Sequence, residues 1–89
     1  MHERTVVIPE GVGLHARPAS RFVEAAAAAG AEVTISKDGG EAVDARSILS
    51  VLGLDVRGGD RVTLRVDGAD GERVAAELAA VLEAGDGDA

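Results

Sequence analysis

The stretch "RVTLRVD", residues 61–67, most strongly constrains what this chain can fold into. Its apolar side chains, Val62, Leu64 and Val66, alternate with the polar side chains of Thr63 and Arg65. Strict alternation predicts a strand with one buried face and one solvated face. Because a chain of 89 residues can bury only one modest core, helices from the same chain must cover the buried face of the sheet.

Two segments have the helical spacing that such a cover requires. A helix predicted over residues 16–29 has an apolar face made of Ala19, Phe22, Val23 and Ala26, and Gly30 follows as a stop. A second helix is predicted after Asp70, an expected N-cap, with an apolar stripe made of Val74, Leu78, Val81 and Leu82. This helix is expected to end by Gly85, before an acidic tail over residues 85–89.

Shorter elements complete the pattern. Further strands are predicted over residues 4–8, 31–37 and 41–45, with Val6, Ile8, Val33 and Ile35 pointing inward. Ser47 opens a brief apolar helix that Gly53 closes. The order β-α-β-β-α-β-α over a single domain, residues 1–89, predicts an α+β fold with helices on one face of a sheet, and it leaves the order of the strands open.

Composition excludes several classes of function. The chain has one Phe and no Trp or Tyr, so aromatic stacking on nucleic acid is not expected. Its net charge of −7 repels polyanions such as DNA and anionic lipid surfaces. No cluster of residues has the spacing of a transition-metal site. The absence of cysteine, of a signal-peptide pattern and of a membrane-spanning segment predicts a cytoplasmic protein.

The stretch "GLHARPAS", residues 13–20, stands at the start of the first predicted helix. Most helices start with Ser, Thr, Asp or Asn, whereas this one starts with His15 and Arg17, and Pro18 lies just inside. A neutral imidazole is a nucleophile, and a phosphoryl group on it would lie against backbone N–H groups that have no other partner. Arg17 adds a guanidinium suited to phosphate oxygens. The alternative is an incidental surface histidine, and these eight residues leave both interpretations open.

The octapeptide is close to the signature of the HPr family, the histidine-containing phosphocarrier proteins of the phosphoenolpyruvate-dependent sugar phosphotransferase system. The segment "DARSILSVLGL", residues 44–54, resembles the regulatory-serine segment of that family. The stretch "VDGADGERVAAELAAVLE", residues 66–83, resembles its last helix. The resemblance therefore spans nearly all of the chain.

The resemblance implies an open-faced sandwich of three helices on a four-stranded antiparallel sheet, and a phosphoryl shuttle that needs no cofactor or metal. His15 matches the histidine that enzyme I phosphorylates on Nδ1 and that then passes the group to enzyme IIA proteins. Ala16 and Arg17 match the phosphate-binding positions, and Ser47 matches a serine that a dedicated kinase modifies in some bacteria. The positions expected to dock partners are Arg21, Ile48, Leu49 and Leu52. The protein is further expected to act as a monomer.

Several positions depart from the family pattern. Val12 stands where many members have Ser or Asn that helps to bind the phosphate. Glu24 and Ala27 replace basic residues that surround the site in some relatives and face acidic partners. The basic side chains expected to remain near the site are Arg17, Arg21 and Arg46.

Two classes of phosphocarrier fit these residues. One is the general shuttle of sugar uptake, and the other is a specialised or regulatory relative in a nitrogen-linked or dihydroxyacetone kinase phosphorelay. A third alternative, an interaction domain that is never phosphorylated, gives no reason for a histidine at the helix start. Ser47 has its own alternative, because a serine there would be chosen as a helix N-cap on structural grounds alone.

Overall fold

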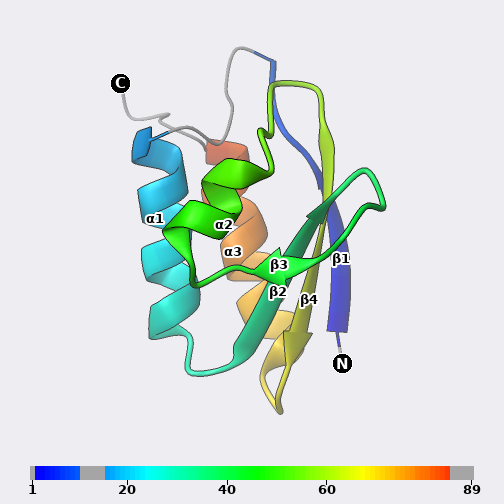
Figure 1. Ribbon diagram of the computed structural model, residues 1–89. Coiled ribbons are helices and arrows are strands. Elements are labelled where there is room, and N and C mark those ends of the chain that lie inside the picture. The colour runs from blue at the N-terminus through cyan, green and yellow to red at the C-terminus, as the bar shows by residue number, and fades with distance from the viewer. Residues whose placement is uncertain (1, 11–15, 85–89) are drawn as a thin grey trace.

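The computed structural model of the protein describes residues 2–10 and 16–84, except for the side chain of Ala16. In chain order its elements are β1 (His2–Val7), α1 (Ala16–Ala28), β2 (Glu32–Lys37), β3 (Val43–Asp44), α2 (Ile48–Gly53), β4 (Arg61–Asp67) and α3 (Gly71–Ala84). The strands form one sheet in the order β1-β4-β2-β3, and every neighbouring pair is antiparallel. The three helices lie on one face of this sheet (Figure 1). The predicted α+β open-faced sandwich is therefore confirmed.

The core lies between the sheet and the helices, where the alternating pattern predicts it. Val62, Leu64 and Val66 of β4 have no exposed surface, and Phe22 of α1 is equally buried. Burial of a side chain of this size contributes roughly 1.5–3 kcal/mol relative to leaving it in water. Because one face of β4 is apolar and the other is polar, the sheet can pack helices on one side only.

The first strand differs from its prediction. β1 begins at His2, two residues earlier than expected, and Ile8 lies just past its end although it is 1% exposed. The cause is the partner strand, since β4 pairs along β1 from His2 opposite Val66 to Val7 opposite Arg61. Backbone pairing with a long neighbour thus extends a strand beyond its apolar residues.

The third strand is much shorter than residues 41–45. β3 has two residues, and the Asp44 carboxylate accepts a hydrogen bond from the backbone N–H of Arg46 at 2.9 Å. Such a bond from a side chain to the backbone two residues later bends the chain and ends the strand. The bend leads the chain from the sheet edge into α2.

Caps define the ends of two helices. Ser47 caps α2 as predicted, because its Oγ accepts a hydrogen bond from Ser50 N–H at 3.3 Å. Asp70 precedes α3 and its backbone carbonyl accepts from Val74 N–H at 2.9 Å, as at an N-cap position. Its carboxylate, however, accepts a hydrogen bond from the Arg73 guanidinium at 3.3 Å, so the expected side-chain cap is replaced by an ion pair.

Candidate functional site

The helix that follows the histidine motif begins where the sequence predicts. α1 starts at Ala16, the residue after His15 in the sequence. His15 and Val12 lie outside the described residues, as does the side chain of Ala16. The first N–H groups of an α-helix have no partner within the helix, so the start of α1 presents backbone donors at the position predicted to hold phosphate.

Arg17 is exposed in the first turn of α1, whereas Pro18 and Ala19 are buried. The buried pair fixes the first turn against the core, and Arg17 is left on the solvent side of the helix. Arg21 is also exposed, and it shares a helix face with Arg17 because the two are four residues apart. The first turn carries no acidic residue. The beginning of α1 is therefore suited electrostatically to an anion.

An apolar patch lies on the neighbouring helix. Leu49 is 79% exposed and Leu52 is 38% exposed, whereas Ile48 is half-buried against the core. We call these three residues of α2 the apolar patch. α2 packs against α1 and lies beside the half of it that contains the first turn (Figure 1). The sequence-predicted docking residues are thus brought to the same end of the molecule as Arg17.

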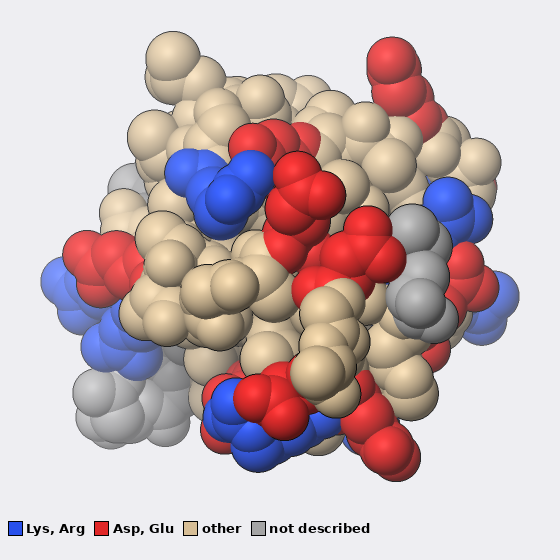
Figure 2. All heavy atoms as spheres, turned by 90° about the horizontal axis from the view of Figure 1, so that it is seen from below, with Lys and Arg blue, Asp and Glu red and all other residues tan. Residues whose placement is uncertain are grey.

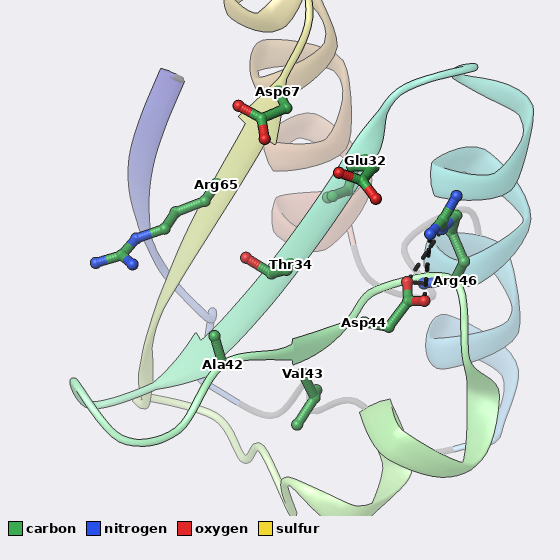
Figure 3. A pocket seen from close by; sticks show the side chains of 9 residues that line it. Glu32, Thr34, Ala42, Val43, Asp44, Arg46, Arg65 and Asp67 are labelled. Atoms are coloured by element: carbon green, nitrogen blue, oxygen red, sulfur yellow. Dashed lines mark hydrogen bonds and ion pairs between the residues drawn. The ribbon is translucent and has the colours of Figure 1, made fainter.

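Ser47 is half-buried at the start of α2, and the residue before it is held by an ion pair. Arg46 donates from Nε to Asp44 Oδ1 at 3.1 Å and from a terminal guanidinium nitrogen to Asp44 Oδ2 at 3.4 Å (Figure 3). The guanidinium of Arg46 holds the pKa of Asp44 below its usual range, and the backbone N–H of Arg46 lowers it further. The Arg46 charge, expected from the sequence to lie near the site, is therefore balanced by Asp44.

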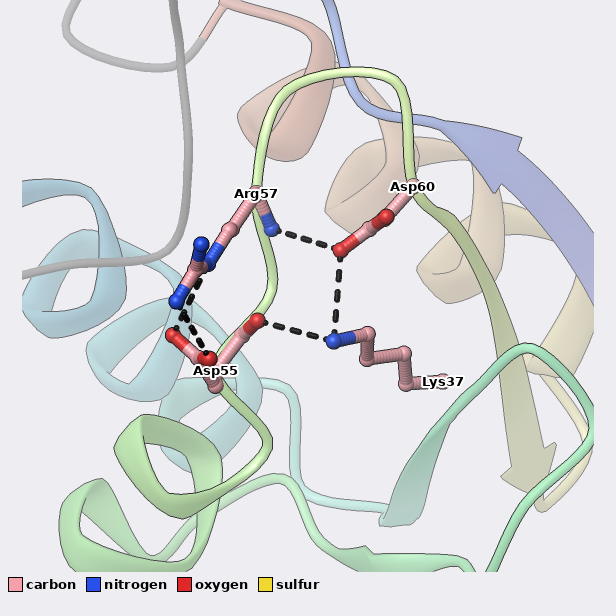
Figure 4. Close-up of polar contacts among 4 residues, drawn as sticks. All are labelled: Lys37, Asp55, Arg57 and Asp60. Carbon is pink, nitrogen blue, oxygen red and sulfur yellow. Dashed lines mark hydrogen bonds and ion pairs between the residues drawn. The ribbon is translucent and has the colours of Figure 1, made fainter.

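A cluster that sequence reasoning missed lies in the loop between α2 and β4. Lys37 at the end of β2 contacts Asp55 and Asp60, and Arg57 contacts the same two residues (Figure 4). The pattern "RGGD" indicates only a turn, because nothing local in it shows that a distant lysine reaches the loop. The one feature of the sequence that could have drawn attention to this cluster is that Lys37 is the only lysine in the chain.

A hollow of about 220 Å³ lies on the open face of the sheet, lined by residues of β2, β3 and β4 (Figure 3). The guanidinium groups at its rim are paired, Arg46 with Asp44 and Arg65 with Glu3. Among residues 2–10 and 16–84, no three His, Cys, Asp or Glu side chains are placed to hold a metal ion. None of the helices in the described part of the chain has the length and apolar character needed to cross a membrane.

Figure 2 shows the end of the molecule at which α1 finishes, and acidic and basic side chains are interspersed on it. This face therefore offers no extended basic surface among the residues described. With a net charge of −7 for the whole chain, attraction of an anion must come from local groups.

The chain is similar to known phosphocarriers over nearly its whole length. Residues 2–84 match the family model described as "PTS HPr component phosphorylation site". The phosphocarrier protein HPr of Streptomyces coelicolor is 50% identical over 84 residues, which cover 94% of this chain and 89% of that protein. The HPr-like protein Crh of Halalkalibacterium halodurans is 36% identical over 83 residues, 93% of this chain and 98% of the relative.

Solved structures agree with the sequence matches. The crystal structure of HPr-C-His from Thermoanaerobacter tengcongensis superposes with a TM-score of 0.85 at 36% identity, and the match covers 94% of this chain and 93% of that one. Fold and sequence thus identify the same family. The chain belongs to the HPr family of phosphocarrier proteins of the phosphotransferase system.

Proposed function

We propose that this protein accepts a phosphoryl group on His15 from phospho-enzyme I and passes it to enzyme IIA proteins during sugar uptake. In the first step, Nδ1 of the neutral imidazole attacks phosphorus, a new N–P bond forms and the bond to enzyme I breaks. In the second step, a nucleophile on enzyme IIA takes the phosphoryl group and His15 returns to its neutral form. Membership of the family supports both steps.

The observation that carries the proposal is the start of α1 at Ala16, next to His15 in the sequence, with Arg17 exposed in the first turn. Backbone N–H groups at a helix start stabilise a phosphate dianion without a cation cofactor. The backbone N–H groups of Ala16 and Arg17 are the proposed donors, and the Arg17 guanidinium stabilises the charge that develops as phosphorus passes between donor and acceptor.

The apolar patch supports docking of both partners at this end. Burying the exposed leucines of α2 against a partner removes apolar surface from water, and this makes the free energy of binding more favourable. Arg21, on the same face of α1 as Arg17, adds a positive group for acidic partners. We also propose that the protein acts as a cytoplasmic monomer and that, where a suitable kinase exists, Ser47 is its target.

A specialised phosphorelay is the second candidate, and two exposed positions of α1 favour it. Glu24 and Ala27 lie on the surface where some relatives have basic residues, so a partner that requires a basic rim would bind weakly. Phosphotransfer from the loaded protein to a panel of enzyme IIA proteins, sugar-specific and nitrogen-linked, distinguishes the two. Faster transfer to sugar-specific proteins supports the general shuttle.

The primary test is incubation with enzyme I and phosphoenolpyruvate, followed by intact mass measurement. The unaltered chain should gain one phosphate that is labile in acid and stable in base, and His15→Ala should gain none. His2→Ala is the matched control, because it removes the only other histidine from β1 and should load normally. Equal loading of the His15→Ala protein would show that the phosphate is carried elsewhere.

A further inference from the structure

The loop of residues 54–60 connects α2 to the end of β1. It leaves directly from α2, which carries the apolar patch. On its other side, Gly59 N–H donates to the Ile8 carbonyl at 2.7 Å, and Ile8 N–H donates to the Asp60 carbonyl at 2.8 Å. Residues 8–10 lead into the segment that contains His15. The loop is therefore a covalent and hydrogen-bonded link between the patch and the chain that leads to the histidine.

Lys37 holds this loop from the end of β2. Its Nζ donates to the Asp55 carbonyl at 3.0 Å and lies 3.4 Å from Asp60 Oδ2 (Figure 4). The Lys37 and Asp60 side chains are 28% and 26% exposed, about half as much as the Arg65 and Glu3 side chains at 52% and 54%. Water screens a partly covered pair less, so this contact keeps more of its attraction at a given distance than a fully exposed pair does.

Asp60 also fixes the turn within the loop. Its Oδ2 accepts a hydrogen bond from Arg57 N–H at 2.8 Å, and Asp60 N–H donates to the Arg57 carbonyl at 3.0 Å. The Arg57 N–H, followed by Lys37, holds the pKa of Asp60 below its usual range. Asp60 is therefore an anion at neutral pH, and it joins the turn to Lys37.

Asp55 ends α2 and is held on two sides. It follows the C-cap residue Leu54, and its φ of 54° is in the left-handed region that commonly ends a helix and that Asp tolerates better than most residues. Lys37 holds its carbonyl, and the Arg57 guanidinium holds its carboxylate at 2.9 Å. Removal of Lys37 leaves this carbonyl without its cation and removes one of the two contacts that hold Asp55.

We propose that Lys37 and Asp60 are positioning residues for phosphoryl transfer. They fix the loop of residues 54–60, and through it the relation between the apolar patch on α2 and the chain that leads to His15. Neither touches the phosphoryl group. This inference rests on the proposed function, because it assumes that a partner docked on the patch delivers phosphate to His15.

The expected effect is on the rate of transfer and not on docking. A variant without the Lys37 cation keeps the leucines of the patch. The KM of enzyme I for the variant should therefore change less than twofold. The reacting atoms, however, would meet in poorer alignment, and misplacement by about 1 Å costs on the order of 10- to 100-fold in rate. At a temperature where all of the protein is folded, a loss of stability alone does not change kcat. A fall in kcat at nearly constant KM therefore indicates a positioning role.

The test measures kcat and KM for phosphate acceptance by Lys37→Met, Asp60→Asn and Lys37→Arg at a temperature where unfolding curves show each to be folded. Lys37→Met should lower kcat about tenfold, and Lys37→Arg should restore most of it, because it keeps the cation. Asp60→Asn keeps the shape and an acceptor for Arg57 N–H, so it reports on the Lys37 pair if the methionine variant is unstable.

Arg73→Met on α3 is the matched control, since it removes a cation that contacts Asp70 and Glu77 in a comparable surface network. Its kcat should equal that of the unaltered chain. Unchanged kcat in Lys37→Met and Asp60→Asn, or a rise in KM alone, would overturn the inference and leave the proposed function intact. Failure of the unaltered chain to load phosphate on His15 would overturn the proposed function and this inference with it.

Discussion

The open face of the sheet and the α1–α2 end of the molecule both meet solvent, but their side chains differ. On the open face, polar groups pair across strands: Arg65 binds Glu3 at 2.6 Å, and the hydroxyls of Thr5 and Thr63 lie 3.4 Å apart. At the α1–α2 end, Leu49 leaves most of its side chain in water. Polar groups that are already paired with one another contribute little to the free energy of binding a partner. Covering an exposed leucine makes that free energy more favourable. The comparison favours the helical end as the proposed docking surface.

The largest expected effect comes from removing Arg17 at the helical end. Arg17→Ala should slow phosphate acceptance about 100-fold, because it removes a donor to the charge that develops in transfer. Its free energy of unfolding should change by less than about 0.5 kcal/mol, as for most exposed positions. Rates and unfolding curves measured on one preparation give both numbers.

Arg65→Ala, on the open face, is the control for that experiment. Loss of its exposed pair with Glu3 should cost up to about 1 kcal/mol of stability and leave transfer unchanged. A stability loss in Arg17→Ala with normal transfer would reverse the comparison and make Arg17 a structural residue.

The next effect concerns exposed apolar side chains. Leu49→Ser should raise the KM of enzyme I for this protein about tenfold, since a central apolar contact at an interface contributes on the order of 1–2 kcal/mol to binding. Val7→Ser, at a residue of β1 that is 53% exposed, should leave KM unchanged. Equal changes in KM for the two variants would mean that the apolar patch does not define the docking surface.

A smaller effect is expected at Ser47, where a cap and the docking face coincide. Ser47→Asp should keep or slightly raise the thermal stability, because a carboxylate at a helix start is favourable, and should lower phosphate acceptance through repulsion of an acidic partner. Ser47→Ala should lose about 1 kcal/mol of stability, the usual cost of a lost N-cap, and accept phosphate normally. If Ser47→Asp accepts phosphate as fast as the unaltered chain, Ser47 serves only as a cap.

The smallest effect is on acid stability. The pKa of Asp60 is lower in the folded protein than its ordinary value of 3.8, so its ionised form favours folding above that pH. The contribution is lost as the pH falls from about 3.8 through the lower folded pKa. Asp60→Asn should therefore be less stable than the unaltered chain at pH 6 and show a flatter decline below pH 4. If the free energies of unfolding measured in urea fall in parallel for the two proteins across this pH range, Asp60 does not contribute to acid unfolding.

The sequence predicts the fold well because its signals are local. The alternation around Leu64 and the helical spacing around Phe22 each identify the buried face of one element, and both residues are fully buried. Strand lengths were less predictable, since β1 is extended by pairing with β4 and β3 is ended by the side chain of Asp44. Those two causes depend on a neighbour in space or on a single hydrogen bond.

The site residues stay predictions, but two local features around them could be read from the sequence. The sequence identified the patch with exposed Leu49 and the cap at Ser47, and both have the predicted exposure or bond. It missed Lys37 and Asp60, which are 23 residues apart and meet only because β2 and the α2–β4 loop are neighbours in the fold. It also counted Arg46 toward the site, although Asp44 two residues earlier holds that guanidinium. The catalytic role of His15 stays a prediction.

The most direct test of the central claim is nuclear magnetic resonance of the ¹⁵N-labelled protein after loading with enzyme I and phosphoenolpyruvate. If His15 carries the phosphate, the spectrum should show a single phosphorus signal coupled to Nδ1 of its imidazole, together with shifts of the backbone amides of Ala16 and Arg17. A phosphorus signal coupled to the His2 ring, to Nε2 of His15 or to no nitrogen would contradict that claim.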